Sequence, residues 1–237
     1  MTVMKKLLSA ALIGIFVVFA VSANAGPYED GSAAYERKDY VTAAKLMRVA
    51  ADQGNAMAQF NLGVSYDDGQ GVILDHKEAV KWLRLSADQG DAKAQYNLGL
   101  MYKDGQGVTQ DYNEAVKWYR LAADQGNAKA QYNLGMRYAN GQGVTQDYKE
   151  AVKWFRLSAD QGNARAQFNL GVMYDNGQGV IQDYVRAHMW WNIAASSGHE
   201  NAKSNRDIVA KTMTPIQIEK AQEMARLCMK TNYKNCD

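Results

Sequence analysis

Residues 112–147 read YNEAVKWYRLAADQGNAKAQYNLGMRYANGQGVTQD, and residues 76–111 match them at 27 of 36 positions. Related copies occupy residues 40–75 and 148–183, and a degenerate copy follows at 184–213. A repeat at this period is typical of solenoids, in which one small unit stacks on copies of itself. We therefore expect an elongated all-α domain whose role is binding rather than catalysis.

Each copy predicts a pair of antiparallel helices joined by tight turns. Asp111 can cap the first helix of the copy quoted above, with Glu114 reaching back toward the cap. Apolar residues then recur at helical spacing, and Gly126 can end the helix in the left-handed conformation. Asn127 can cap the second helix, which ends at the sequence NGQG. The predicted fold is an α-solenoid of stacked antiparallel helix pairs.

Small residues recur inside the predicted helices and indicate close packing. Gly135 lies in the middle of a helix, where an exposed glycine costs about 1 kcal/mol relative to alanine, so its recurrence indicates a steric need for close backbone contact. A tryptophan such as Trp118 recurs in the paired helix, and its apolar spacing favours a core position. The equivalents in the other copies are Gly63, Gly99 and Gly171, and Trp82, Trp154 and Trp190.

The segments that flank the repeats predict caps for both ends of the stack. Residues 26–39 predict a lone capping helix, and residues 40–213 hold five repeats, the last of them degenerate. Residues 214–237 predict a C-terminal capping helix and a tail, because Thr214 followed by Pro215 is a typical helix start.

Two cysteines, Cys228 and Cys236, lie in the last ten residues. In an exported protein they would meet an oxidising compartment, which predicts a disulfide that closes the tail. The alternative is a pair of thiols that stay free or bond between molecules.

Residues 1–25 have the pattern of a secretory signal peptide, with two lysines ahead of the apolar run 7–21. The sequence ANA that ends at Ala25 predicts cleavage after that residue. The alternative is a membrane anchor, but the apolar run is shorter than the ~20 residues that a span needs. We expect a periplasmic or secreted bacterial protein with no stable membrane insertion after cleavage.

The charge of the remaining chain is balanced, with 25 basic and 25 acidic residues after the signal segment is removed. No run of Lys or Arg supplies the clustered basic surface that nucleic acid binding needs. We expect a monomer whose partner is a protein or a peptide and not a nucleic acid.

The sequence offers no catalytic or metal-binding motif. Its histidines, His76, His188 and His199, lie in separate segments, and no H-E-x-x-H motif is present. The GQGV turns follow helices rather than strands and lack the Gly-Lys-Ser/Thr sequence of a phosphate loop. Their spacing also lacks the oxygen ligands of a calcium loop. We expect no catalytic residues, no cofactor and no metal.

The repeat pattern A-x-x-W-x-x-x-A/S-A-x-x-G-x-A-x-A-Q-x-x-L-G-x-x-Y-x-x-G-x-G-V resembles Sel1-like repeats (SLRs), relatives of the tetratricopeptide repeats. The resemblance covers about residues 28–213. In one copy it is carried by Ala115, Trp118, Gly126, Ala128, Ala130, Gln131, Leu134, Gly135, Tyr138, Gly141 and Gly143.

The resemblance implies a right-handed superhelix of helix pairs and an adaptor or scaffold role in protein complexes. One secreted, cysteine-rich branch of the family is described as binding or slowly hydrolysing β-lactams and has a disulfide in each repeat. This chain has no cysteine inside any repeat. Other exported bacterial members resemble it more closely and take part in envelope remodelling, signalling or host interaction.

Two rows of residues are candidates for partner binding. The position after each tryptophan stays apolar but changes identity, as expected if it faces a groove on the first helices; the alternative is a second core position. The next position holds an arginine that could bind a peptide carboxylate, or could simply lie on a solvated face. The two rows are Leu83, Tyr119, Phe155 and Trp191, and Arg84, Arg120 and Arg156.

Three functions remain open from the sequence. The favoured one is an exported, non-enzymatic module that binds a protein or peptide on the concave face of the solenoid. The second is a β-lactam-binding or weak β-lactam-hydrolysing activity, which only the family resemblance suggests. The third is a structural protein that associates with itself through its ends.

Overall fold

Our computed structural model describes residues 26–234 and 236, and helices are the only regular secondary structure in this part of the chain. The predicted signal peptide, residues 1–25, lies outside the described residues. The helices are α1 (Pro27–Glu36), α2 (Tyr40–Asp52), α3 (Ala56–Asp68), α4 (His76–Asp88), α5 (Ala92–Asp104), α6 (Tyr112–Asp124), α7 (Ala128–Asn140), α8 (Tyr148–Ala159), α9 (Ala164–Asn176), α10 (Tyr184–Ser196), α11 (Glu200–Val209) and α12 (Pro215–Lys230), with a short 3₁₀ turn at Ala210–Thr212.

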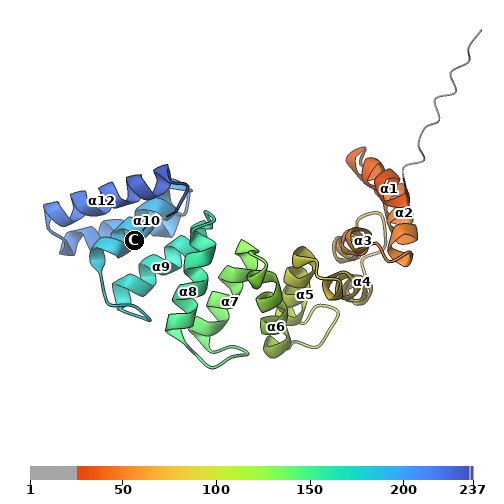
Figure 1. Cartoon of the computed structure of the whole chain (residues 1–237), viewed down its shortest axis with the longest axis horizontal. Coiled ribbons are helices and arrows are strands. Elements are labelled where there is room, and N and C mark those ends of the chain that lie inside the picture. The colour runs from red at the N-terminus through yellow and green to blue at the C-terminus, as the bar shows by residue number, and fades with distance from the viewer. Residues whose placement is uncertain (1–25, 235, 237) are drawn as a thin grey trace, which may run out of the picture.

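The helices stack in pairs along a curved path (Figure 1). From α1 to α10, each odd-numbered helix packs most closely on the even-numbered helix that follows it. In Figure 1, α3 and α5 lie on the inner side of the curve, and α4 and α6 lie on its outer side. The predicted all-α solenoid of helix pairs is confirmed, and we refer below to inner (odd) and outer (even) helices.

The helix starts follow the predicted caps with one difference. The Asp111 carboxylate accepts hydrogen bonds from the backbone N–H groups of Asn113, at 2.8 Å, and Glu114, at 3.1 Å. Glu114 was expected to reach back to the cap, but its carboxylate instead accepts from Nζ of Lys117 at 2.5 Å. A cation one turn away on the same helix face competes successfully for this side chain.

The second glycine of each GQG turn is required by a close approach. Gly143 has a φ of 73°, and a Cβ there would collide with the carbonyl oxygen of Tyr112 at the start of the preceding outer helix. Only glycine combines a positive φ with the absence of a side chain. The glycine therefore lets the turn between an inner helix and the next outer helix lie against the start of the preceding outer helix.

The glycines in the middle of the inner helices allow the paired helices to touch. A Cβ at Gly135 would lie 2.7 Å from the ring of Phe155 and 3.2 Å from the carbonyl oxygen of Ala151. The same contact joins Gly99 to Tyr119, and it recurs in the flanking pairs. The predicted steric need for these glycines is confirmed, and the tryptophans of the outer helices are buried as expected.

Buried glutamines connect helices both within pairs and between successive pairs. The side chain of Gln95 donates to the carbonyl oxygen of Ala87 at 3.1 Å and accepts from Nε2 of Gln125 at 2.8 Å. Equivalent bonds join Gln89 to Gln59 and Gln161 to Gln131. In the last copy Ser197 stands at the position of the donor glutamines Gln89, Gln125 and Gln161, so the series of glutamine–glutamine bonds ends there.

The C-terminal helix α12 packs on α10. Met189 and Ile193 of α10 are buried, whereas Lys153 and Leu157 occupy the same positions in the preceding outer helix and are exposed. The chain has therefore replaced a solvated face by an apolar one where α12 docks. The change from Lys153 to Met189 at equivalent positions marks the end of the regular stack.

Two contacts hold the tail beyond α12 against the rest of the chain. Cys228 and Cys236 form a disulfide, as expected, with their Cα atoms 4.7 Å apart. The ring of Tyr233 covers the turn at Gly162, where a built Cβ would lie 3.1 Å from Cε2 of the ring. The turns at Gly54, Gly90, Gly126 and Gly198 have no such cover among the described residues.

We predict that Gly135→Ala lowers the free energy of unfolding by ~1–3 kcal/mol, because the added methyl group forces the Phe155 ring out of place. Chemical denaturation of the wild type and the variant measures this. As a control, Leu157→Ala removes an exposed side chain from α8, the helix that carries Phe155. It should change stability by less than ~0.5 kcal/mol. A Gly135→Ala protein as stable as the wild type would contradict the tight contact.

We predict that the protein loses stability in acid because His188 is buried. It is buried beside Arg206 and Asp207, and burial lowers its pKa below the usual value of 6.5. The unfolded chain therefore binds a proton first, so stability is full above about pH 6.5 and falls as the pH drops toward the folded-state pKa.

The outer helices α4, α6 and α8 carry Val80, Val116 and Val152 at the position of His188. His188→Val should therefore reduce the fall in melting temperature between pH 8 and pH 5 without destabilising the protein at pH 8. Thermal melts of the two proteins at both values provide the measurement. An equal fall in both proteins would show that other groups cause the acid sensitivity.

Candidate functional site

The first predicted row of binding residues lies in the interior. Leu83, Tyr119, Phe155 and Trp191 are each 3% exposed or less, and each covers the glycine of the preceding inner helix. They point from the outer helices toward the inner ones and offer no surface to a partner. The interpretation as groove-facing residues is therefore corrected, and the alternative weighed above, a second core position, is the one that the structure supports.

The second predicted row lies between successive pairs. Nη2 of Arg84, Arg120 and Arg156 donates to the hydroxyl group of a tyrosine on the next inner helix. Each guanidinium group also lies over the ring of the next outer tryptophan, at 5.0 to 5.7 Å from the ring centroid. The tyrosines are Tyr102, Tyr138 and Tyr174, and the tryptophans are Trp118, Trp154 and Trp190.

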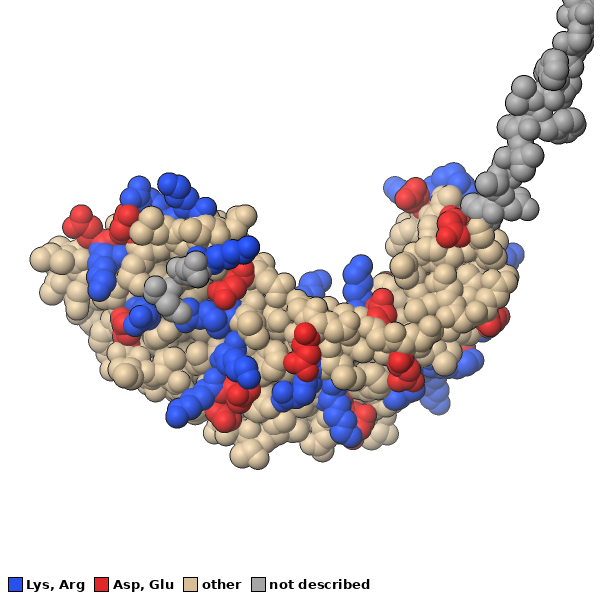
Figure 2. Space-filling model, viewed as in Figure 1, with Lys and Arg blue, Asp and Glu red and all other residues tan. Residues whose placement is uncertain are grey.

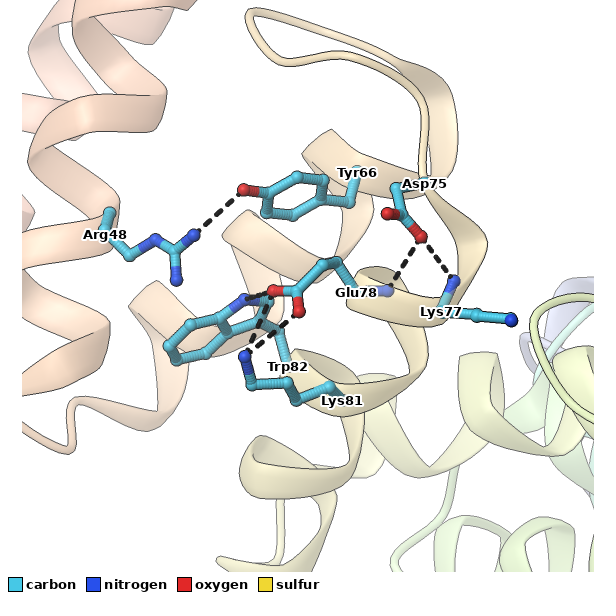
Figure 3. Close-up of polar contacts among 7 residues, drawn as sticks. All are labelled: Arg48, Tyr66, Asp75, Lys77, Glu78, Lys81 and Trp82. Atoms are coloured by element: carbon cyan, nitrogen blue, oxygen red, sulfur yellow. Dashed lines mark hydrogen bonds and ion pairs between the residues drawn. The ribbon is translucent and has the colours of Figure 1, made fainter.

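Arg48 belongs to the same series, although the sequence analysis missed it. Its Nη2 donates to the hydroxyl group of Tyr66 at 3.0 Å, and its guanidinium group lies 4.9 Å from the Trp82 ring centroid (Figure 3). The Trp82 indole N–H in turn donates to Glu78 at 3.1 Å. The constant spacing of Arg, Tyr and Trp, at 18 and 34 residues, was the signal that could have found it.

We call this series of four arginines, with their tyrosines and tryptophans, the arginine ladder. Its guanidinium groups hydrogen-bond to hydroxyl groups and stack on aromatic rings of the chain itself. Cation–π contacts and charge-assisted hydrogen bonds hold such groups in place. The ladder therefore connects one helix pair to the next, and the geometry favours this role over the capture of a partner's carboxylate.

The surface left open is the face of the inner helices. Two neighbouring positions recur there at the 36-residue period, an aromatic residue followed by an asparagine, and all eight side chains are half-buried. We call them the groove rows. They are Phe60, Tyr96, Tyr132 and Phe168, and Asn61, Asn97, Asn133 and Asn169.

The asparagines gave a signal that sequence reasoning passed over. An identical polar residue stands in all five copies, as Asn205 in the last, at a position that neither caps a helix nor fills the core. A side-chain amide has two donors and can accept two hydrogen bonds. Asn169, for example, directs one N–H to the sulfur of Met136 at 3.2 Å. Such an amide keeps further capacity for the N–H and C=O groups of a peptide.

Tyr96 is a hydrogen-bond donor in the groove rows. Burial raises the pKa of its hydroxyl group above the usual value of 10, and a hydrogen bond with the side chain of Asn133 and the charge of Arg165 oppose this only in part. The hydroxyl group therefore stays protonated at neutral pH.

Around Tyr96 the inner face is hollowed. A depression of about 420 Å³ is lined by Tyr96, Tyr132 and Asn133 together with Lys129 and Arg165 of α7 and α9. Figure 2 shows that the inner side of the arc carries few charges, with some basic side chains projecting from it. The face thus combines aromatic area, amides and a few cations.

The part of the chain that the structure describes has neither a metal site nor a membrane span. No cluster of three or more His, Cys, Asp or Glu side chains in it could hold a metal ion. None of its helices is both long enough and apolar enough to cross a bilayer.

These features define a helical repeat protein with an open inner face. The Sel1 repeat family matches residues 23–55, 56–91, 92–127, 128–163 and 164–199. Each of these units begins with an inner helix, whereas the division used in our sequence analysis begins with an outer one. The chain belongs to the Sel1 repeat family.

Solved structures show the same fold. A protective antigen of uropathogenic Escherichia coli, described as displaying an SLR fold, is 34% identical, with a TM-score of 0.77. The match covers 89% of this chain but 46% of the antigen, so this chain spans about half of that protein. A Sel1 repeat protein from Oxalobacter formigenes is also 34% identical, with a TM-score of 0.71, covering 83% of this chain and 84% of that one. Among curated proteins, none is a match.

The arginine ladder predicts a contribution to stability. Arg120→Met should lower the free energy of unfolding by ~1–2 kcal/mol, because a charge-assisted hydrogen bond and cation–π contacts are lost. Chemical denaturation checks this, with Lys117→Met as the matched control on the same helix. The ion pair of Lys117 with Glu114 is exposed and should contribute little to stability. Equal losses in the two variants would remove the special role of the ladder.

Proposed function

We propose that this protein is a non-enzymatic scaffold that holds an extended segment of a partner protein against the groove rows. The observation that carries the proposal is the recurrence of an aromatic residue followed by an asparagine on every inner helix from α3 to α9. Aromatic rings supply rigid apolar contact area, and asparagine amides can pair with a main chain of any sequence.

The outer helices support this choice of face. Their large side chains cover the inner glycines, and their arginines bind tyrosines and tryptophans of the stack. These side chains are committed to cohesion, whereas the groove rows are half-buried and open to one side. A partner on the inner face can therefore bind without displacing the arginine ladder or the side chains that cover the glycines.

We also propose that the protein works outside the cytoplasm, in the periplasm or as a secreted protein. The N-terminal pattern with cleavage after Ala25 supports this, and the Cys228–Cys236 disulfide fits an oxidising compartment. The balanced charge without the signal segment supports a protein or peptide partner over a nucleic acid. We propose a monomer, because one chain presents all four members of each groove row.

The alternative of β-lactam binding or hydrolysis gains no support from the repeats. The branch of the family that it was inferred from has a disulfide in each repeat, and this chain has no cysteine in any of them.

The proposal predicts binding that depends on the asparagines. Peptides selected from a random phage-displayed library against residues 26–237 should bind the wild type. They should bind an Asn97→Ala/Asn133→Ala variant about tenfold or more weakly, since two hydrogen bonds of ~0.5–1.5 kcal/mol are lost. Titration by fluorescence anisotropy measures both affinities.

Asn113→Ala is the matched control, because Asn113 is exposed on an outer helix. It should leave peptide affinity unchanged, and circular dichroism should show all variants folded. Failure to select any peptide, or equal affinity for the Asn97→Ala/Asn133→Ala variant and the wild type, would contradict the proposal.

A further inference from the structure

The degenerate last repeat has a hollow lined by Trp191, Asn205 and Val209, and the first repeat has one at the equivalent place. The hollow in the first repeat measures about 190 Å³ and lies between α1, α2 and α3. Its walls include the apolar side chains of Ala43, Met47 and Val64, and the polar side chains of Ser65 and Asn61. Asn61 is the first member of the asparagine row, so the hollow adjoins the groove rows at the N-terminal end of the inner face.

The hollow exists because one position changed from large to small. Ser65 stands where the later copies have Met101, Arg137 and Met173. Met101 is buried and shares a core cluster with Leu83, which is the equivalent of Met47. In the second repeat a methionine of the chain itself thus packs in the region that the first repeat leaves empty.

The internal comparison indicates which chemical group fits. A methionine side chain packs at the equivalent place in the second and fourth repeats, so an apolar, unbranched chain suits the walls. The volume is sufficient, since an engineered apolar cavity of about 150 Å³ holds benzene. Glu36, which also lines the hollow, disfavours an acidic group.

We infer that this hollow is a specificity pocket that takes one apolar side chain, of methionine, leucine or phenylalanine type, from a peptide bound along the groove rows. The inference rests on the proposed function and adds a sequence preference to it. The asparagines hold the main chain, which all peptides share, and the pocket selects one residue near the α1 end of the groove.

The pocket can be tested with small probes that do not require a known partner. N-acetyl-L-methionine methylamide and N-acetyl-L-phenylalanine methylamide are titrated into ¹⁵N-labelled residues 26–237, with N-acetylglycine methylamide as the control. The first two should shift the amide resonances of Ala43, Asn61 and Ser65, and the glycine compound should not.

Two variants of Ser65 show whether the probes bind in this pocket. Ser65→Met supplies the side chain that the second and fourth repeats use, so the variant should fold and fill the pocket, and the shifts should vanish. Ser65→Ala leaves the pocket open and should keep them. Probes that bind Ser65→Met as they bind the wild type, or that leave the pocket resonances unmoved in the wild type, would overturn the inference.

Selected peptides separate this inference from the proposed function. Peptides from the phage library should share one apolar residue, and their affinity for Ser65→Met should fall roughly ten- to hundredfold, the effect of losing the burial of one such side chain. Peptides that need the groove asparagines but bind Ser65→Met normally would refute the pocket and leave the proposed function standing. Probe binding in the pocket without any selected peptide would leave the pocket standing and contradict the proposed function.

Discussion

The structure depends on one close contact, repeated along the chain, between a bare glycine backbone and a large side chain of the paired helix. Gly63, Gly99, Gly135 and Gly171 each receive the side chain that follows an outer tryptophan. The covering residue is Leu, Tyr, Phe or Trp in turn, because any of these can lie against a surface that has no Cβ. Replacing the glycine would separate the helices, whereas changing the covering side chain only changes how the same space is filled.

A second set of interactions joins one pair to the next, and it leaves the inner face open. The arginine ladder connects successive pairs, and so do the bonds from the buried glutamines to carbonyl oxygens of the preceding outer helices. In a solenoid each unit contacts only its neighbours, so stability is a sum of terms within and between units. Here the outer helices supply the arginines and tryptophans of these terms. The half-buried aromatic and asparagine residues of the inner helices take no part in the arginine ladder, which is why we propose that they serve a partner.

Departures from the repeat carry as much information as the repeat itself. Where Lys becomes Met at position 189, an exposed face becomes apolar and α12 covers it. Where Met becomes Ser at position 65, a filled space becomes a hollow at the inner face. Both changes alter a single position in a nearly constant unit, and the other copies show what the unchanged position does.

The sequence by itself determined the period, the helices, their caps and the need for glycine at the centre of each inner helix. These properties follow from spacing and from local backbone preferences that act within one or two turns. It did not determine which apolar positions are buried and which stay half-exposed on the inner face. Periodicity assigns Tyr119 to an apolar stripe, but only the packing of α5 on α6 shows that Gly99 lies beneath its ring. Likewise, the identical asparagines are visible in the sequence, yet only the curvature of the stack decides that their face stays open. Burial and exposure depend on contacts between helices distant along the chain, and no local pattern encodes them.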